Sequence, residues 1–236
     1  MVSDRVYCQK THTESSTLFG RNPDMKLTNQ IIGQVNLSSF ECHDLGGGTL
    51  WTGRLPDALT PDSAAFESLW QLHPEEFHEV LMHGRLVKTP RWQQAFGRDY
   101  HYTGKVNQAL PIPSLLEPFL HWARKNVDDA LNGLLLNWYD GQRGHYIGRH
   151  RDSIQHLVPG AAIVTISIGE ERTFRLRPWP AQPGATPIDF PASHGTVFVM
   201  PWDTNRVFTH EVPASTRRTG RRISVTLRGF LNERPG

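Results

Sequence analysis

Two segments in the first half of the chain carry apolar residues at the spacing of amphipathic helices. We expect the first helix at about 61–72, where Thr60 can cap its N-terminus. We expect the second at about 115–131, because Ser114 and Glu117 match a capping box. The apolar face of the second helix would consist of Leu116, Leu120, Ala123, Val127 and Leu131.

The pattern changes after residue 132 to short runs rich in β-branched and aromatic residues, separated by Gly, Pro and Asp. We read these runs as strands: GLLLNWY, AIVTISIG, RTFRLRPW, GTVFVMP, RVFTHEV and RRISVTLRGF. Helices followed by many strands predict an α+β fold that is mainly β, an antiparallel sandwich or barrel supported by N-terminal helices. A jelly roll is one common solution. Residues 1–48 are polar and weakly periodic, so we expect an N-terminal extension there, partly flexible, and one domain over 49–236.

The composition narrows the class of protein. A hydrophobic fraction of 38% and a charged fraction of 20% are typical of a soluble globular chain, and the formal net charge is only +2. Cys8 and Cys42 lie outside any CxxC spacing, which excludes a disulfide framework and suits a reducing compartment. The first residues lack an apolar leader, and no apolar run approaches the length of a membrane span. We therefore expect a cytoplasmic or nuclear monomer with no membrane partner.

The stretch HYIGRHRDSIQH, residues 145–156, places His150 and Asp152 two positions apart. On a strand, both side chains would project from one face. The pair is either a solvated strand or turn, or two ligands of the 2-His-1-carboxylate facial triad that holds Fe(II). His210, in RVFTHEV, is the candidate third ligand, and His194 is the weaker one. The flanking histidines are read as surface or supporting residues: His145 and His156.

The run RRISVTLRGF carries a second signal. Arg222, Ser224, Thr226 and Arg228 share one strand face, opposite an apolar face. Two guanidiniums on a buried face are costly unless an anion meets them, and a dicarboxylate would satisfy both. The alternative is an edge strand whose arginines point into solvent. Upstream, two polar residues also share a strand face and could help to hold a carboxylate: Asn137 and Tyr139.

Together, N-x-Y, H-x-D, TISIGEERTFRLR, GTVFVMP, His210 and R-x-S-x-T-x-R resemble the AlkB-like Fe(II)/2-oxoglutarate dioxygenases in their order and spacing. The resemblance covers about residues 80–230 and is closest to the nucleic-acid demethylase branch. It implies a double-stranded β-helix, with a lid at about 83–107 and a catalytic β-core at about 132–232. It also implies the use of Fe(II), 2-oxoglutarate and O₂.

Carried over residue by residue, the resemblance implies that His150, Asp152 and His210 bind iron. Arg228 and Asn137 would hold the 1-carboxylate of 2-oxoglutarate. The 5-carboxylate would be held by Arg222 and Tyr139. Ser224 stands where family members usually have Asn, so that contact would be shorter or lost.

The segment HGRLVKTPRWQQAFGRDYHYTGK interleaves basic and aromatic residues, as in surfaces that track phosphates and stack on bases. Its candidate substrate-binding residues are Arg91, Trp92, Phe96, Tyr100 and Tyr102. The resemblance to a lid favours Phe96 as the base-stacking residue. The alternative is a hairpin whose aromatic side chains pack into the domain.

Two departures from the family bear on the substrate. Ile154 stands where repair enzymes of the family place an acidic residue that contacts the damaged base, which argues against repair of 1-methyladenine and 3-methylcytosine. The segment MHGRLVKT is short and polar for a wedge into duplex DNA. We expect an oxidative demethylase of alkylated DNA or RNA that prefers single-stranded or flipped bases. The alternatives are a hydroxylase of a small metabolite and a catalytically dead binding module.

Overall fold

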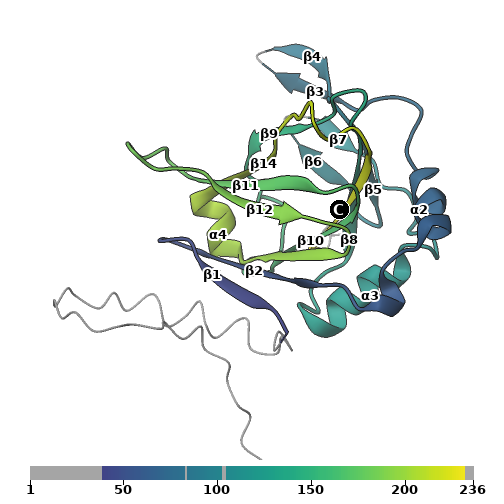
Figure 1. Ribbon diagram of the computed structural model, residues 1–236, viewed down its shortest axis with the longest axis horizontal. Coiled ribbons are helices and arrows are strands. Elements are labelled where there is room, and N and C mark those ends of the chain that lie inside the picture. The colour runs from purple at the N-terminus through teal and green to yellow at the C-terminus, as the bar shows by residue number, and fades with distance from the viewer. Residues whose placement is uncertain (1–38, 83, 103–104, 232–236) are drawn as a thin grey trace, which may run out of the picture.

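Two antiparallel β-sheets packed face to face form the body of the protein (Figure 1). The computed structural model describes residues 39–82, 84–102 and 105–231. In spatial order, the large sheet contains β1 (Glu41–Asp44), β2 (Thr49–Arg54), β13 (Thr196–Met200), β10 (Ile163–Gly169), β15 (Arg221–Arg228), β8 (Gly133–Asp140) and β5 (Trp92–Phe96). The small sheet contains β12 (Ile188–Ala192), β11 (Arg172–Pro178), β14 (Phe208–Val212) and β9 (Ile147–His150). This arrangement confirms the predicted jelly-roll class.

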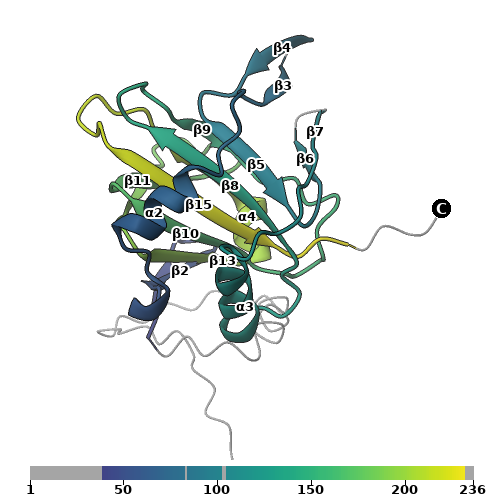
Figure 2. The same ribbon diagram turned by 90° about the vertical axis from the view of Figure 1, so that its right-hand side faces the viewer.

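The outer face of the large sheet is covered by helices α2 (Ser63–Trp70) and α3 (Glu117–Asn126), as Figure 2 shows. Leu69, Phe119 and Ala123 of these helices join one core cluster with alternate residues of the strands. The Nε1 of Trp138 donates to the carbonyl of Leu69 at 3.0 Å, which ties α2 to β8. Because the helices cover only the outer face, the inner face of the large sheet faces the small sheet.

Both predicted helices are present, but their predicted caps are wrong. Asp62, not Thr60, caps α2, and its carboxylate accepts from the backbone N–H of Ala65 at 2.8 Å. Helix α3 begins after Leu116 without a side-chain cap, because the helix starts beside a proline rather than at Ser114. The helix is also shorter than predicted, although Leu131, beyond its end, is still completely buried.

Each of the six predicted strand runs contains a strand. The run RVFTHEV is a strand only from Phe208, because a short helix, α4 (Trp202–Val207), precedes it. Strand β1 pairs with β2 in antiparallel register, so the ordered sheet begins within the segment predicted as an extension. The rest of that segment, residues 1–38, lies outside the described residues.

Two hairpins project from one end of the sheets (Figures 1 and 2): β3 (Glu79–Met82) with β4 (Arg85–Lys88), and β6 (Tyr100–Tyr102) with β7 (Lys105–Asn107). They lie within or beside the region predicted as a lid. The first hairpin exposes apolar side chains at Leu81, Leu86 and Val87, so this segment is less polar at its surface than its sequence indicates. Within the described ranges, no helix has the length and apolarity that crossing a bilayer would require.

Candidate metal and dicarboxylate site

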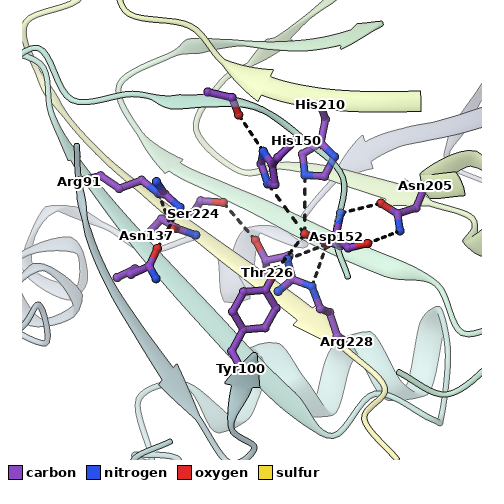
Figure 3. Close-up of polar contacts among 12 residues, drawn as sticks. Arg91, Tyr100, Asn137, His150, Asp152, Asn205, His210, Ser224, Thr226 and Arg228 are labelled. Carbon is purple, nitrogen blue, oxygen red and sulfur yellow. Dashed lines mark hydrogen bonds and ion pairs between the residues drawn. The ribbon is translucent and has the colours of Figure 1, made fainter. Parts of the chain in front are cut away.

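Two histidines and one aspartate meet between the sheets (Figure 3). The Nε2 atoms of His150 and His210 lie 3.9 and 4.0 Å from the Oδ1 of Asp152. His150 is the last residue of β9, and its Cα is the register partner of His210 in β14. In the part of the chain that the structure describes, this is the group of histidine, cysteine and carboxylate side chains placed to share a metal ion.

The surroundings of His150 prepare it for metal binding. Its Nδ1 lies 2.8 Å from the carbonyl oxygen of Gly148, which favours a proton on Nδ1. The lone pair is then on Nε2, the nitrogen on the side of Asp152, and can bind a metal ion. Burial, with the nearby His210, lowers the pKa of His150 to about 3. Burial also lowers the pKa of His210. Both imidazoles are therefore neutral near pH 7, as metal ligation requires.

Asp152 is held on three sides. The Nε and Nη2 of Arg228 donate to its Oδ2 at 2.9 and 2.7 Å, and the hydroxyl of Tyr100 donates to its Oδ1 at 3.1 Å. Asn205 clamps its backbone, accepting from the Asp152 N–H at 3.0 Å and donating to its carbonyl at 3.1 Å. Burial raises the pKa of the Asp152 carboxyl, but Arg228 and the two histidines outweigh it and hold that pKa well below its usual range.

Strand β15 presents two buried guanidiniums to the same space. It is a central strand between β10 and β8, so its arginines are buried, and the alternative of a solvent-facing edge strand is excluded. Arg222 is 1% exposed, and its Nε donates to the Oγ of Ser167 at 2.9 Å. Within the described residues, its Nη1 and Nη2 and the Nη1 of Arg228 have no acceptor at normal hydrogen-bond geometry, although the side chain of Tyr139 lies beside Arg222.

Orphaned guanidinium donors in a buried cavity call for an anion, because a buried charge without acceptors is costly. The cavity wall includes Tyr139, whose ring lies 5.0 Å from the guanidinium carbon of Arg222. Burial lowers the pKa of Arg222, and neighbouring Tyr139 opposes that shift. Arg228 lies at the metal cluster and Arg222 lies six residues along the strand, so an anion with two charged ends would fit between them.

Asn137 and Ser224 are cross-strand partners on the wall of this cavity. The Oδ1 of Asn137 accepts from the Nε of Arg91 at 2.7 Å, and the Nη2 of Arg91 donates to Gln93 at 2.9 Å. The Oγ of Ser224 lies 3.4 Å from the Oγ1 of Thr226. Every residue predicted to bind the cosubstrate thus lines one cavity with the two histidines of the candidate metal cluster.

Two of the aromatic residues predicted to contact substrate, Trp92 and Phe96, do not line this cavity. Phe96 and Trp92 belong to β5, are 3% and 6% exposed, and pack into the core, so the prediction that they stack on a base is wrong. The predicted alternative, aromatic side chains packed into the domain, holds for both. Arg91 is buried beside Asn137 and cannot track a phosphate at the surface.

The other predicted substrate residues are divided between interior and rim. Tyr100 is buried on the cavity wall, where its hydroxyl reaches Asp152. Ile154 is exposed beside the metal ligands in an open surface groove. Tyr102 ends β6, and its side chain lies outside the described part of the chain.

The remaining histidine candidates do not join the metal cluster. His194 accepts from the backbone N–H of Gly169 at 3.0 Å. His145 is buried and packs edge-on against Trp92, and His156 stacks on His101. These positions favour His210 over His194 as the third ligand.

Asn205 is a site residue that the sequence does not reveal. It lies in α4, between Pro201 and β14, and is 1% exposed. An asparagine in a short polar run is typical of a loop, and only the fold brings it against the backbone of Asp152. Its one sequence signal is its place five residues before His210, which alone indicates nothing.

Comparison with known proteins agrees with this geometry. The family model of the 2OG-Fe(II) oxygenase superfamily matches residues 63–228. The chain is 27% identical over 161 residues to the human DNA oxidative demethylase ALKBH2, covering 64% of this chain and 61% of that protein. It is 28% identical over 129 residues to the rat alpha-ketoglutarate-dependent dioxygenase alkB homolog 3, covering 48% and 43%.

A third relative is the RNA replication protein of Grapevine virus A, 26% identical over 168 residues, which cover 71% of this chain and 9% of that protein. The chain thus spans less than two thirds of the length of each of these three relatives. The superfamily uses Fe(II), 2-oxoglutarate and O₂, and the cluster of His150, Asp152 and His210 could bind the iron. From the family match and the geometry of the site, the chain belongs to the 2OG-Fe(II) oxygenase superfamily and is AlkB-like.

Proposed function

We propose that this chain is an Fe(II)/2-oxoglutarate-dependent dioxygenase that oxidatively demethylates alkylated nucleic-acid bases presented as single strands or as flipped nucleotides. The observation that carries the chemistry is the buried cluster of His150, Asp152 and His210 beside the partly unpaired guanidiniums of Arg222 and Arg228. The relatives, one of which is named a DNA oxidative demethylase, support the substrate class.

The residues present fit both groups. Two neutral imidazoles and one carboxylate are the donor set of the Fe(II) facial triad. In this proposal, iron is held by the Nε2 atoms of His150 and His210 and by the carboxylate of Asp152. The orphaned donors of Arg222 and Arg228 fit the two carboxylates of 2-oxoglutarate, with Arg228 at the end nearer the metal because it already binds Asp152.

When bound, iron and 2-oxoglutarate supply, with O₂, the oxidation that hydroxylates the alkyl carbon, after which a methyl group leaves the base as formaldehyde. The chain's own residues prepare the site for this step. Arg228 and Tyr100 fix the Asp152 carboxylate, and Gly148 fixes the His150 ring. The burial of the arginines keeps water away from the cosubstrate.

Formaldehyde and succinate release from a panel of methylated oligonucleotides tests the proposal. The panel contains each methylated base in a single strand and in the matching duplex. We expect both products from single strands, with less formaldehyde from duplexes, and neither product from His150→Ala. Because Leu86 and Val87 are exposed on the first hairpin, the duplex arm is needed to decide the strand preference. Equal release from both forms would contradict that preference.

A second candidate function is hydroxylation of a small metabolite. The observation that favours it is Ile154, an exposed aliphatic side chain beside the metal ligands, which cannot accept a hydrogen bond from a base. Succinate formation without formaldehyde across the whole panel would favour this candidate. A chain that forms no succinate under any condition would instead be a binding module that retains the fold.

A further inference from the structure

A groove on the surface beside the metal ligands gathers three arginines around one exposed tryptophan. Its lining residues include Arg149, Arg151, Arg206, Trp179, His150 and Ile154. Trp179 is 44% exposed, and the guanidinium carbons of Arg149 and Arg151 lie 5.9 and 5.0 Å from its ring centre. The tryptophan thus holds two positive charges together on one ring.

Protein acceptors already fix the direction of these guanidiniums. The Nε of Arg149 donates to the Oγ1 of Thr209 at 2.9 Å, and the Nη1 of Arg151 donates to the carbonyl of Arg206 at 2.8 Å. These acceptors are neutral, so they orient the charges without cancelling them. Because these hydrogen bonds already order the two arginine side chains, the side chains lose less conformational entropy when a ligand binds them.

The groove has little negative charge of its own. Among its lining residues the acid is Asp152, which is buried and bound to Arg228. Arg206 has a loose ion pair with Asp203 at 3.9 Å, whereas no carboxylate lies within ion-pair distance of Arg149 or Arg151 among the described residues. Like charges collected without a counter-charge at an open surface indicate an anionic ligand.

We infer that this groove binds the sugar-phosphate backbone of the single strand that carries the target nucleotide. Guanidinium groups match phosphate oxygens, and an exposed indole provides a face on which a neighbouring base can stack. His150 and Asp152 are among the residues that line the groove, so a strand that occupies it would lie beside the proposed metal site. This inference rests on the proposed nucleic-acid substrate, and it assigns strand binding to this groove rather than to the lid predicted at 83–107.

Binding of a fluorescent, unmethylated single-stranded oligonucleotide tests the inference without any turnover. The protein is loaded with Mn(II) and 2-oxoglutarate, and anisotropy is followed from low to moderate salt. We expect Arg149→Gln and Arg151→Gln each to weaken binding about fivefold at low salt. Each should also make the negative slope of log K against log[salt] less steep by about 0.7. Trp179→Leu should weaken binding with less change in that slope, because the ring carries no charge.

Arg124→Gln is the matched control, because Arg124 is an exposed arginine on α3, on the outer face of the large sheet. It should bind the oligonucleotide as the unmodified protein does. The inference is overturned if the Arg149→Gln/Arg151→Gln double variant binds like the Arg124→Gln control, or if the unmodified protein binds no oligonucleotide. It is also overturned if a free mononucleotide displaces the strand at similar concentration, which would assign the groove to a small phosphorylated ligand.

The experiments distinguish a failure of the groove inference from a failure of the proposed demethylase function. A protein that binds the strand through Arg149 and Arg151, yet releases no formaldehyde from any methylated oligonucleotide, would retain the groove and lose the demethylase proposal. A protein that demethylates oligonucleotides with unchanged KM in the double variant would retain the demethylase proposal and lose the groove.

Discussion

Replacing Arg222 with methionine should stabilise the ligand-free protein and abolish its binding of 2-oxoglutarate. The guanidinium is 1% exposed, and its Nη1 and Nη2 lack acceptors among the described residues. Each unsatisfied buried donor costs about 1–3 kcal/mol, whereas the lost hydrogen bond from the charged guanidinium to Ser167 is worth about 1.5–3 kcal/mol. The Ser167 Oγ loses the donor Arg222 Nε but still donates to the carbonyl of Ala192, so the hydroxyl keeps one hydrogen bond.

Allowing for the lost contact with the Tyr139 ring, the expected net gain is about 1 kcal/mol. For a chain of this size each kcal/mol raises Tm by about 2–4 °C, so thermal unfolding measures the effect. The unmodified protein should gain about 2.7 kcal/mol when 2-oxoglutarate is present at about 100 times its Kd. Arg222→Met should gain almost nothing, so the difference between the two proteins should shrink or reverse as ligand is added.

Arg221→Met is the control, because Arg221 is the adjacent residue of β15, points outward and pairs with Glu67. Loss of that exposed pair should change stability by less than about 1 kcal/mol and leave the ligand-induced shift intact. The reasoning is refuted if Arg222→Met lowers the Tm of the ligand-free protein and still shows the full shift with 2-oxoglutarate.

Three further outcomes follow from the same site. In metal-free protein, burial lowers the pKa of His150 to about 3 from 6.5, so the unfolded chain binds a proton that the folded chain excludes between these values. The free energy of unfolding should therefore fall as pH falls below 6.5, by up to about 1.4 kcal/mol per pH unit, and a denaturant series that shows no such slope would contradict this. Asn205→Leu removes both hydrogen bonds to the Asp152 backbone and should weaken Co(II) binding about tenfold in a spectroscopic titration, whereas unchanged affinity would show that the clamp is dispensable. Ile154→Glu supplies an acceptor at the rim and should raise formaldehyde release from cationic methylated bases about tenfold relative to neutral ones; an unchanged ratio would place the base away from residue 154.

The strand half of the fold could be predicted because its signals are local. Alternation along RRISVTLRGF separates two arginines from three aliphatic residues, and that separation survives as the inner and outer faces of β15. Alternation does not show whether the polar face of the strand is exposed to solvent or buried in the protein. That depends on the neighbours of β15 in the sheet, which are β10 and β8, strands 53 or more residues away in sequence.

The segment WQQAF shows a case in which local sequence signals do not predict the environment of the side chains. It contains no β-branched residue and carries two glutamines, so its strand signal rests on Trp92 and Phe96 alone. The resemblance places it in a lid, with a hairpin whose aromatics pack into the domain as the alternative. Pairing with β8 makes it part of the large sheet and buries Trp92 and Phe96. The pairing is a tertiary effect that overrides local propensity.

Strand alternation explains only part of the geometry of the candidate metal ligands. Strand alternation was expected to bring His150 and Asp152 to one face, but β9 ends at His150. Asp152 faces the histidines because Arg228 and Tyr100 hold its carboxylate and Asn205 holds its backbone. The three residues that fix it come from three separate elements, so the H-x-D spacing identifies the ligands without explaining their geometry.

The buried and the exposed arginines of the site differ in what their substitution would cost the fold. Arg222 and Arg228 are buried, and their positions are set by the core of the large sheet, so a change in their chemistry alters the cosubstrate site and the stability of the fold together. Arg149, Arg151 and Ile154 lie in the exposed groove, where substitution costs little stability. If the groove binds the substrate as inferred, its residues can change the substrate accepted while the proposed metal cluster keeps the oxidation unchanged. The groove residues, rather than the proposed metal ligands, are then the positions to vary in a search for the substrate.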